Sequence, residues 1–267
     1  VPITDAASSN LRFESVLFTG VGLSQGLEDF TFTQPDLTGL VLRGSGHVVD
    51  RSDFQICPNS CVEILGSRIT VKNSVFSYSQ LNGGAYSGTI NIMGPDALVR
   101  DNRLDELGVS GIVIGPGATN ARVTNNFIDN WGRLAYSRAG GIVAYGKGQG
   151  SCEIDSNMIF RQSIIDPPPS NPLPGGAINL AFGRDNAWVH HNIIDDAMVG
   201  IRLGGFVGGG DQDNSTNNSI FSNSVGSRVQ YSWLRVGMSS PSPYFGTHID
   251  NNIFRTDAGM QDQRSFQ

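Results

Sequence analysis

Tyr145 and Lys147 stand two positions apart in the segment Tyr-Gly-Lys-Gly, and together they offer a phenol and an amine. Lysine is otherwise scarce, since Lys72 and Lys147 are the only lysines among 18 basic residues. Abstraction of a proton beside a carboxylate needs a base, and cations must then neutralise the enolate. Tyr, Lys and Arg suit these roles. We therefore take Lys147, Tyr145 and Arg202 as candidate catalytic residues for β-elimination, although an exposed turn and scattered surface arginines need no function.

These candidates lie within an array of repeats. Each repeat has an apolar residue, then Asn or Ser three places on, then another apolar residue two further. Successive starts are 22 to 35 residues apart, so one structural unit repeats and the insertions vary in length. The instances are Val49-Ser52-Phe54, Val71-Ser74-Phe76, Val99-Asn102-Leu104, Val123-Asn126-Ile128, Ile154-Asn157-Ile159, Val189-Asn192-Ile194, Ile220-Asn223-Val225 and Ile249-Asn252-Phe254, with Leu27-Phe30-Phe32 as an expected ninth.

A second phrase, typified by Ile112-Val113-Ile114, occurs between these bends and alternates with the period of a strand. Two strands and a bend within 22 residues leave no room for a helix. Asn suits the bend because it tolerates the left-handed backbone, and stacked Asn side chains can hydrogen-bond between coils. The outward row of the second phrase reads Glu63, Asn91, Val113, Val143, Asn179, Arg202, Arg235.

The pattern resembles the right-handed parallel β-helix of the pectate-lyase-like proteins over residues 27–256. The fold class expected is all-β, a single-stranded parallel β-helix solenoid of about nine coils with loop insertions on one edge. Residues 1–26 would form a partial N-terminal coil or a cap strand, and residues 257–267 a C-terminal tail. In the resembling families the substrate lies beside the sheet of the second phrase.

The resemblance therefore implies a groove beside that sheet, walled by insertions such as 131–140 and 162–175. Solenoids bind elongated ligands in such grooves. The expected substrate-binding residues are Arg133, Tyr136, Arg138, Asn179, Arg235, Glu63 and Asn91.

Other chemistries have weaker support in the sequence. Glycoside hydrolysis needs two carboxylates roughly 5 to 10 Å apart, and the outward rows offer only Glu63. The Gly-His-Gly and paired aspartates of the resembling polygalacturonases are absent, and so is the Arg-x-Pro-x-x-Arg typical of pectate lyases.

His190-His191 and nearby aspartates form a second polar cluster. His190 and Asp155 share an outward row and could touch. A metal would need a third ligand from another coil, so we expect a solvated His/Asp pair and no metal site. His191 falls in the bend itself and is expected to be structural. Ca²⁺ is the one candidate cofactor, through Asp211, Asp213 and Asn214, which we interpret as turn formers.

Composition limits the partners. The net charge of −6 and the scarcity of Lys argue against nucleic acid and anionic membranes, and no apolar run has membrane-spanning length. Cys57 and Cys61 could close a small disulfide loop, which would suit an exported protein, whereas Cys152 is expected to be a buried thiol.

We therefore expect an extracellular or virion-surface protein that acts on an acidic polysaccharide, most plausibly as a lyase or epimerase. The alternatives are the glycan-binding shaft of a phage tailspike or surface adhesin and a structural repeat segment. Because an open coil exposes its core and strand edges, we also expect a homotrimer or flanking chain to cover the ends.

Overall fold

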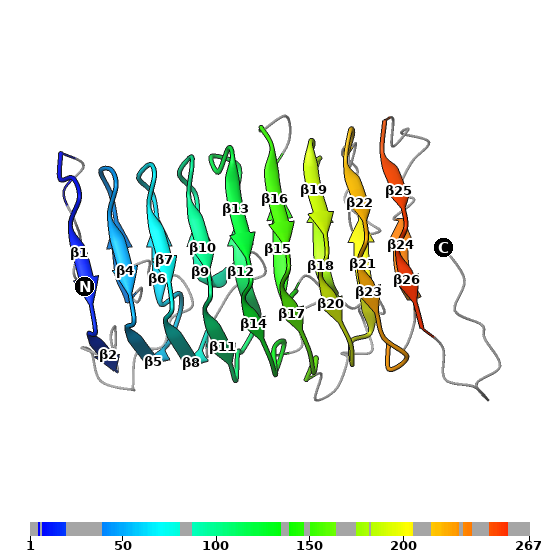
Figure 1. Cartoon of the computed structure of the whole chain (residues 1–267). Coiled ribbons are helices and arrows are strands. Elements are labelled where there is room, and N and C mark those ends of the chain that lie inside the picture. Colours follow the sequence, from blue (N-terminus) through cyan, green and yellow to red (C-terminus); the bar gives the residue numbers. More distant parts are fainter. Residues whose placement is uncertain are drawn as a thin grey trace.

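The computed structural model is a stack of short strands, the first beginning at Arg12 and the last ending at Phe254 (Figure 1). It describes residues 5, 7–19, 39–80, 87–134, 139–146, 150–163, 175–181, 183–204, 215–229, 232–236 and 246–255. These residues include no helix, and so no helix long and apolar enough to cross a membrane. Their strand pairs are all parallel and form three sheets. The expected parallel β-helix is confirmed.

The pre-bend sheet contains the first half of each repeat phrase. Its nine strands are β1 (Arg12–Glu14), β4 (Val48–Asp50), β7 (Thr70–Lys72), β10 (Leu98–Arg100), β13 (Ala121–Thr124), β16 (Cys152–Asp155), β19 (Ala187–His190), β22 (Ser219–Phe221) and β25 (His248–Asp250).

The post-bend sheet contains the second half of each phrase. Its nine strands are β2 (Leu17–Thr19), β5 (Asp53–Cys57), β8 (Val75–Ser79), β11 (Arg103–Asp105), β14 (Phe127–Ile128), β17 (Met158–Ile159), β20 (Ile193–Ile194), β23 (Ser224–Val225) and β26 (Ile253–Phe254).

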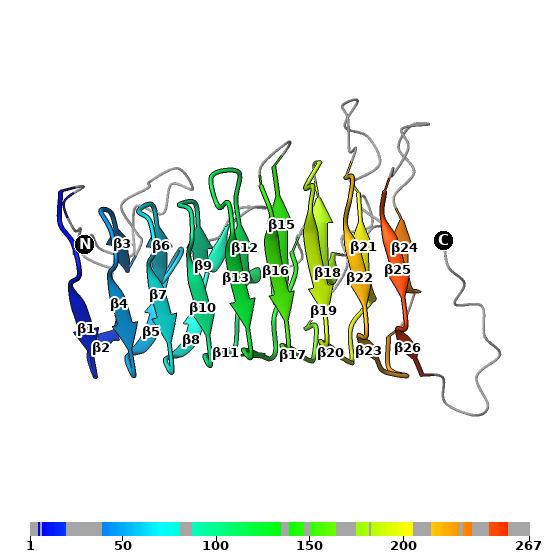
Figure 2. The same cartoon turned by 45° about the horizontal axis from the view of Figure 1, so that its top comes forward.

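The Ile-x-Ile sheet is built from the second phrase. Its eight strands are β3 (Leu40–Leu42), β6 (Val62–Ile64), β9 (Gly88–Ile92), β12 (Ser110–Ile114), β15 (Ile142–Tyr145), β18 (Gly176–Ala181), β21 (Val199–Leu203) and β24 (Ser232–Val236). Figures 1 and 2 show successive coils side by side, from β1 at one end to β25 and β26 at the other.

The bend between the first two sheets is made by one residue with a left-handed backbone, which in every described coil but the first is followed by Ser or Asn. The left-handed residues have φ between 50° and 57° and are Ser15, Arg51, Asn73, Asp101, Asn125, Ser156, His191, Ser222 and Asn251. The next residue forms the expected ladder, in which each backbone N–H donates to the side-chain oxygen of the following coil. In its central steps Asn126 donates to Asn157, and Asn157 to Asn192, both at 3.0 Å.

Inward side chains fill the centre of the stack in columns. Phe18, Phe54 and Phe76 stack with ring centroids 4.4 and 4.8 Å apart. Beyond them Leu104 and Ile128 continue the same column and are fully buried. Burial of such continuous apolar columns is what holds a solenoid together, since each coil contacts only its neighbours.

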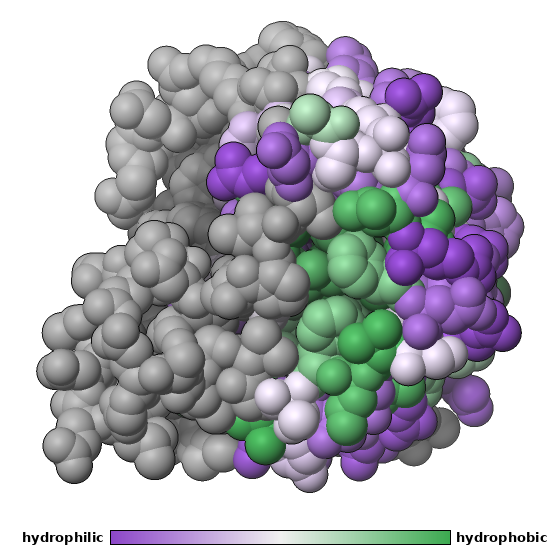
Figure 3. Space-filling model, turned by 90° about the vertical axis from the view of Figure 1, so that its left-hand side faces the viewer, coloured by the Kyte–Doolittle hydropathy of each residue, from purple (hydrophilic) through white to green (hydrophobic). Residues whose placement is uncertain are grey.

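The N-terminal coil lies within residues 1–26, where a partial coil or cap strand was expected, and the phrase paired with Val49 is not the expected Leu27-Phe30-Phe32. β1 pairs with β4 and β2 with β5, so the phrase before Val49 is Phe13-Val16-Phe18. Leu27-Phe30-Phe32 lies outside the described residues. Viewed from the β1 end, hydrophobic residues are visible among hydrophilic ones (Figure 3), and Leu17 is 59% exposed.

Candidate functional site

The predicted outward row of the Ile-x-Ile sheet exists as a backbone register. Pairing aligns Glu63 with Asn91, and continues through Val113 and Val143 to Asn179. The row then passes to Arg202 and Arg235. The long insertions enter between β8 and β9, β14 and β15, and β17 and β18, which places them on one edge of this sheet.

The middle of this row is buried. Asn91 is 8% exposed, Asn179 1% and Arg202 2%, and the two valines between them are equally inaccessible. The side chains in the middle of the outward row of this sheet are therefore not exposed to solvent. The predicted floor of the groove is covered.

Glycines at the entry to the strands explain part of the burial. A Cβ on Gly140 would lie 2.8 Å from the Val143 side chain and 2.9 Å from Nδ2 of Asn179. A Cβ on Gly176 would lie 2.9 Å from Oδ1 of Asn179 and 3.2 Å from the Cβ of Arg202. The segment entering each strand thus passes closely over the outward row, and any larger residue would displace it.

Asn91 and Asn179 hold these entry segments in place. The Oδ1 of Asn91 accepts the backbone N–H of Gly88 at 2.7 Å, and that of Asn179 accepts from Gly176 at 2.8 Å. Their Nδ2 groups donate to Ser60 Oγ and to the carbonyl of Ala139. Buried amides bonded in this way support the backbone, a role that the sequence did not separate from substrate binding.

Tyr145 and Glu63 remain partly exposed. Burial raises the pKa of the Tyr145 phenol above its ordinary value, so the phenol is protonated at neutral pH. Burial also raises the pKa of Glu63, and the charge of Arg43 opposes this effect. Gly146, the residue after Tyr145, has φ 119° and packs its backbone against Pro116 of the previous coil.

The wall of the predicted groove is only partly described. Arg133 forms an ion pair with Glu106 at 2.6 Å. Tyr136, Arg138 and Lys147 lie outside the described residues, and the side chain of Arg235 does too. The placement of these residues along the predicted groove therefore stays a prediction.

The His190 cluster is organised differently from the expected pair. His190 and Asp155 are in register, but the Nε2 of His190 lies 3.1 Å from Oε1 of Glu153. Asp155 instead accepts two bonds from Arg122 and one from Thr124. Within the described ranges no group of three or more His, Cys, Asp or Glu residues could hold a metal ion.

The two closely spaced cysteines are bonded. Cys57 and Cys61 form a disulfide with a Cα–Cα distance of 5.3 Å, and Cys152 is a buried free thiol as expected.

Comparison with known proteins supports the architecture. A family model described as a right handed beta helix region matches residues 14–202. No curated protein and no solved structure matches the chain.

Proposed function

Because the chain belongs to the right-handed β-helix family, we propose that it recognises an elongated acidic polysaccharide along the Ile-x-Ile sheet. The observation that carries this proposal is the register of Arg202 with Arg235 in adjacent coils. It puts two cationic residues side by side in a row whose one acidic residue, Glu63, lies several coils away. Local cationic charge in a protein of net charge −6 favours an anionic ligand at that place.

Because Arg202 is buried, it can act on an anionic ligand only through its charge and not through direct contact. A charge beneath the surface is screened less by salt than an exposed one. It does not deliver hydrogen bonds to a polymer. Direct contacts would come from partly exposed groups, including Tyr145, Glu63 and Arg133, and from the insertions along the same edge. This arrangement supports polysaccharide binding more directly than it supports catalysis.

A second candidate function is β-elimination or epimerisation of the bound uronic acid. The observation that favours it is Tyr145, which is partly exposed at the end of β15 and is followed by Gly146, which packs on Pro116. A protonated phenol suits proton donation, whereas the base would be Lys147 two residues on. Arg202, as a buried residue, would stabilise the enolate through its charge alone.

We propose that the protein is exported. The Cys57–Cys61 disulfide supports this location, because such bonds persist mainly in oxidising compartments.

Affinity electrophoresis tests the binding proposal. The chain is run through gels containing polygalacturonate, alginate, chondroitin sulfate or a bacterial capsule polymer, with and without Ca²⁺. We expect at least one polymer to retard it, less so at high salt, and Arg235→Gln to weaken the effect. Arg103→Gln, an exposed arginine of the post-bend sheet, is the matched control and should migrate like the wild type. Migration unaffected by every polymer would refute the proposal.

Product analysis separates the two candidate functions. Elimination creates unsaturated uronates that absorb in the ultraviolet, and Lys147→Ala would abolish the rise. Epimerisation changes the proton NMR spectrum of the polymer without absorbance. New reducing ends without absorbance would mean hydrolysis and a different set of residues. Binding with no product would identify a glycan-binding shaft.

A further inference from the structure

A tryptophan on the pre-bend sheet is unusual in its exposure. The chain has three tryptophans, of which Trp131 is fully buried and Trp233 is 8% exposed. Trp188, on β19, is 54% exposed. An indole left half in water offers an apolar face on which a ligand can stack.

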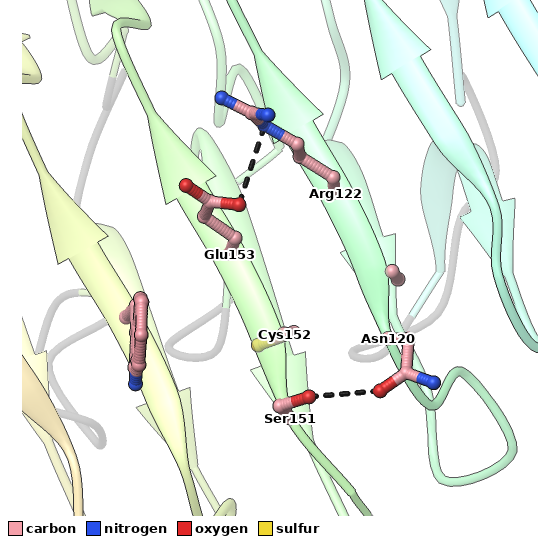
Figure 4. A pocket seen from close by; sticks show the side chains of 7 residues that line it. Asn120, Arg122, Ser151, Cys152 and Glu153 are labelled. Carbon is pink, nitrogen blue, oxygen red and sulfur yellow. Dashed lines mark hydrogen bonds and ion pairs between the residues drawn. The ribbon is translucent and has the colours of Figure 1, made fainter.

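Trp188 borders a hollow of about 280 Å³ on the outer face of β13, β16 and β19. Asn120, Arg122, Ser151, Cys152 and Glu153 line the hollow and are labelled in Figure 4, and Ala121 completes it. None of these positions belongs to the row of the Ile-x-Ile sheet discussed above. The hollow is a separate feature on another face.

The rim of the hollow is polar and preorganised. Ser151 Oγ donates to Asn120 Oδ1 at 2.9 Å, and Asn120 Nδ2 donates to Asp96 at 3.2 Å. Arg122 donates hydrogen bonds from Nε and Nη2 to the carboxylate of Asp155. The Oε2 of Glu153 lies 3.3 Å from the Nε of Arg122 (Figure 4). Within the described part of the chain Nη1 of Arg122 has no hydrogen-bond partner. These groups retain donors and acceptors suited to hydroxyl groups.

The charge of the rim selects the kind of ligand. The charged residues that line the hollow are one guanidinium, Arg122, and one carboxylate, Glu153, which lie 3.3 Å apart. Their charges balance, so the lining does not favour an anionic polymer. A neutral ligand with hydroxyl groups on its rim and an apolar face fits both the charges and the indole.

The spacing of the residues suits a chain of sugars. Arg122 pairs with Glu153, and Glu153 pairs with Trp188, so the three outward side chains stand on consecutive coils. Adjacent strands are roughly 4.8 Å apart, which is close to the length of one pyranose ring in an extended glycan. A short glycan along the stack axis would therefore meet one residue per ring.

From these observations we propose that the hollow beside Trp188 is a second glycan site, which binds a neutral oligosaccharide. One pyranose stacks its C–H face on the indole, whose π face is negative. The hydroxyls of the next rings accept from Arg122 Nη1 and donate to Glu153. The site does not depend on the acidic-polysaccharide function proposed above, since it lies on another sheet and its charged lining residues balance.

Titration with neutral hexasaccharides tests the site. Cellohexaose, maltohexaose, mannohexaose and xylohexaose are titrated separately into the chain, and binding is followed by calorimetry and by indole fluorescence. At least one should bind and shift the emission of Trp188. Trp188→Ala should lower the affinity at least about tenfold, as truncation of a central contact residue does. Trp188→Phe, which keeps an aromatic face, should retain a larger share of the affinity.

The controls separate this site from the other one. Met158→Ala, an exposed apolar position (44%) on the post-bend sheet, should bind hexasaccharide as the wild type does. Trp188→Ala should keep its retardation by acidic polymers, and Arg235→Gln should keep its hexasaccharide binding. Failure of all four hexasaccharides to bind the wild type, or undiminished binding by Trp188→Ala, would overturn the inference.

Discussion

Two adjacent residues make each bend, and each has a different role. The first adopts the left-handed backbone, and residues as different as Arg51, Asn125 and His191 do so. The second supplies the hydrogen bonds that join the coils. Within the array Asn157 donates to the carbonyl of Val123 and to Asn192, and its own Oδ1 accepts from both nitrogens of Asn126. Each interior amide therefore serves three coils at once.

Replacing an interior ladder residue should cost far more than replacing the last one. Asn157→Ala leaves several buried backbone groups unpaired, at about 1–3 kcal/mol each, so we expect a loss of roughly 3–5 kcal/mol in unfolding free energy. Asn252 is partly exposed at the end of the ladder, and Asn252→Ala should cost clearly less. Urea denaturation of both variants measures the difference. Equal losses would contradict a cooperative ladder.

Asp155 makes stability depend on pH. Burial would raise the pKa of this carboxyl, but hydrogen bonds from Arg122 and Thr124 outweigh burial and hold the pKa below its ordinary value of 3.8. A lowered folded-state pKa contributes stability above about pH 4, which is lost as the pH falls through the folded pKa. Asp155→Asn should cost about 2 kcal/mol at pH 7, and the gap from the wild type should narrow at pH 2.5. Thermal unfolding midpoints of the wild type and Asp155→Asn between pH 7 and pH 2.5 measure this difference in stability. A difference that stays constant with pH would contradict the prediction.

At the scale of elements, the strands were predictable because every coil repeats the same local chemistry. Apolar residues alternate, and Asn or Ser follows at a fixed offset, so phrases such as Val123-Asn126-Ile128 locate β13, the bend and β14 directly. Sequence could not place the first coil as well, since Phe13-Val16-Phe18 has Val at the ladder position.

The candidate site was less predictable, because burial depends on where the entry segments run. We expected outward residues of the Ile-x-Ile sheet to line an open groove, yet Asn179 and Arg202 are covered. One signal was present: the runs 112–114 and 142–144 are apolar at all three positions, which is typical of strands buried on both faces. Trp188 was overlooked for the opposite reason. It lies in an ordinary repeat phrase, and only its outward register with Glu153 distinguishes it.

The segment joining β5 to β6 is closed by the Cys57–Cys61 disulfide. A loop of five residues is short, so the chain-entropy effect of the bond is small, about 2 kcal/mol. The Cys57→Ser/Cys61→Ser variant should therefore fold and lose about that amount in guanidinium denaturation. Thiol titration of unreduced, denatured wild type should find one free thiol, Cys152. Three reactive thiols, or a variant as stable as the wild type, would speak against the bond.

At the scale of the whole molecule, the stack presents different chemistry on different sides. The Ile-x-Ile row ends in two arginines, whereas the charged residues that line the hollow on the pre-bend sheet, Arg122 and Glu153, balance each other. Both ends leave inward apolar side chains less covered than those inside the stack. Ile249 is 39% exposed, whereas its partner Ile220 in the preceding coil is 1% exposed, and Phe13 and Phe18 at the other end are only partly buried. The expectation of a homotrimer or flanking chain over these ends stays a prediction. Because the two candidate sites lie on different sheets, a substitution at one site can be tested without changing the other, provided the coils behave as modules.

Deletion of one complete coil tests that modularity. Val71 and Val99 are 28 positions apart, so removing residues 74–101, which are 28 residues, joins Asn73 to Asn102 and restores a complete bend phrase. The N–H of Ser52, which donates to Ser74 Oγ, would then meet the Oδ1 of Asn102. Because each coil contacts only its neighbours, the variant should keep its β circular dichroism, unfold cooperatively and bind hexasaccharide at Trp188. Deleting residues 88–101 removes β9 and β10 but leaves β8, so neighbouring coils lose their register and the chain should fail to fold. A folded half-coil variant, or an unfolded whole-coil variant, would show that stability resides in the insertions instead of in the stacked coils.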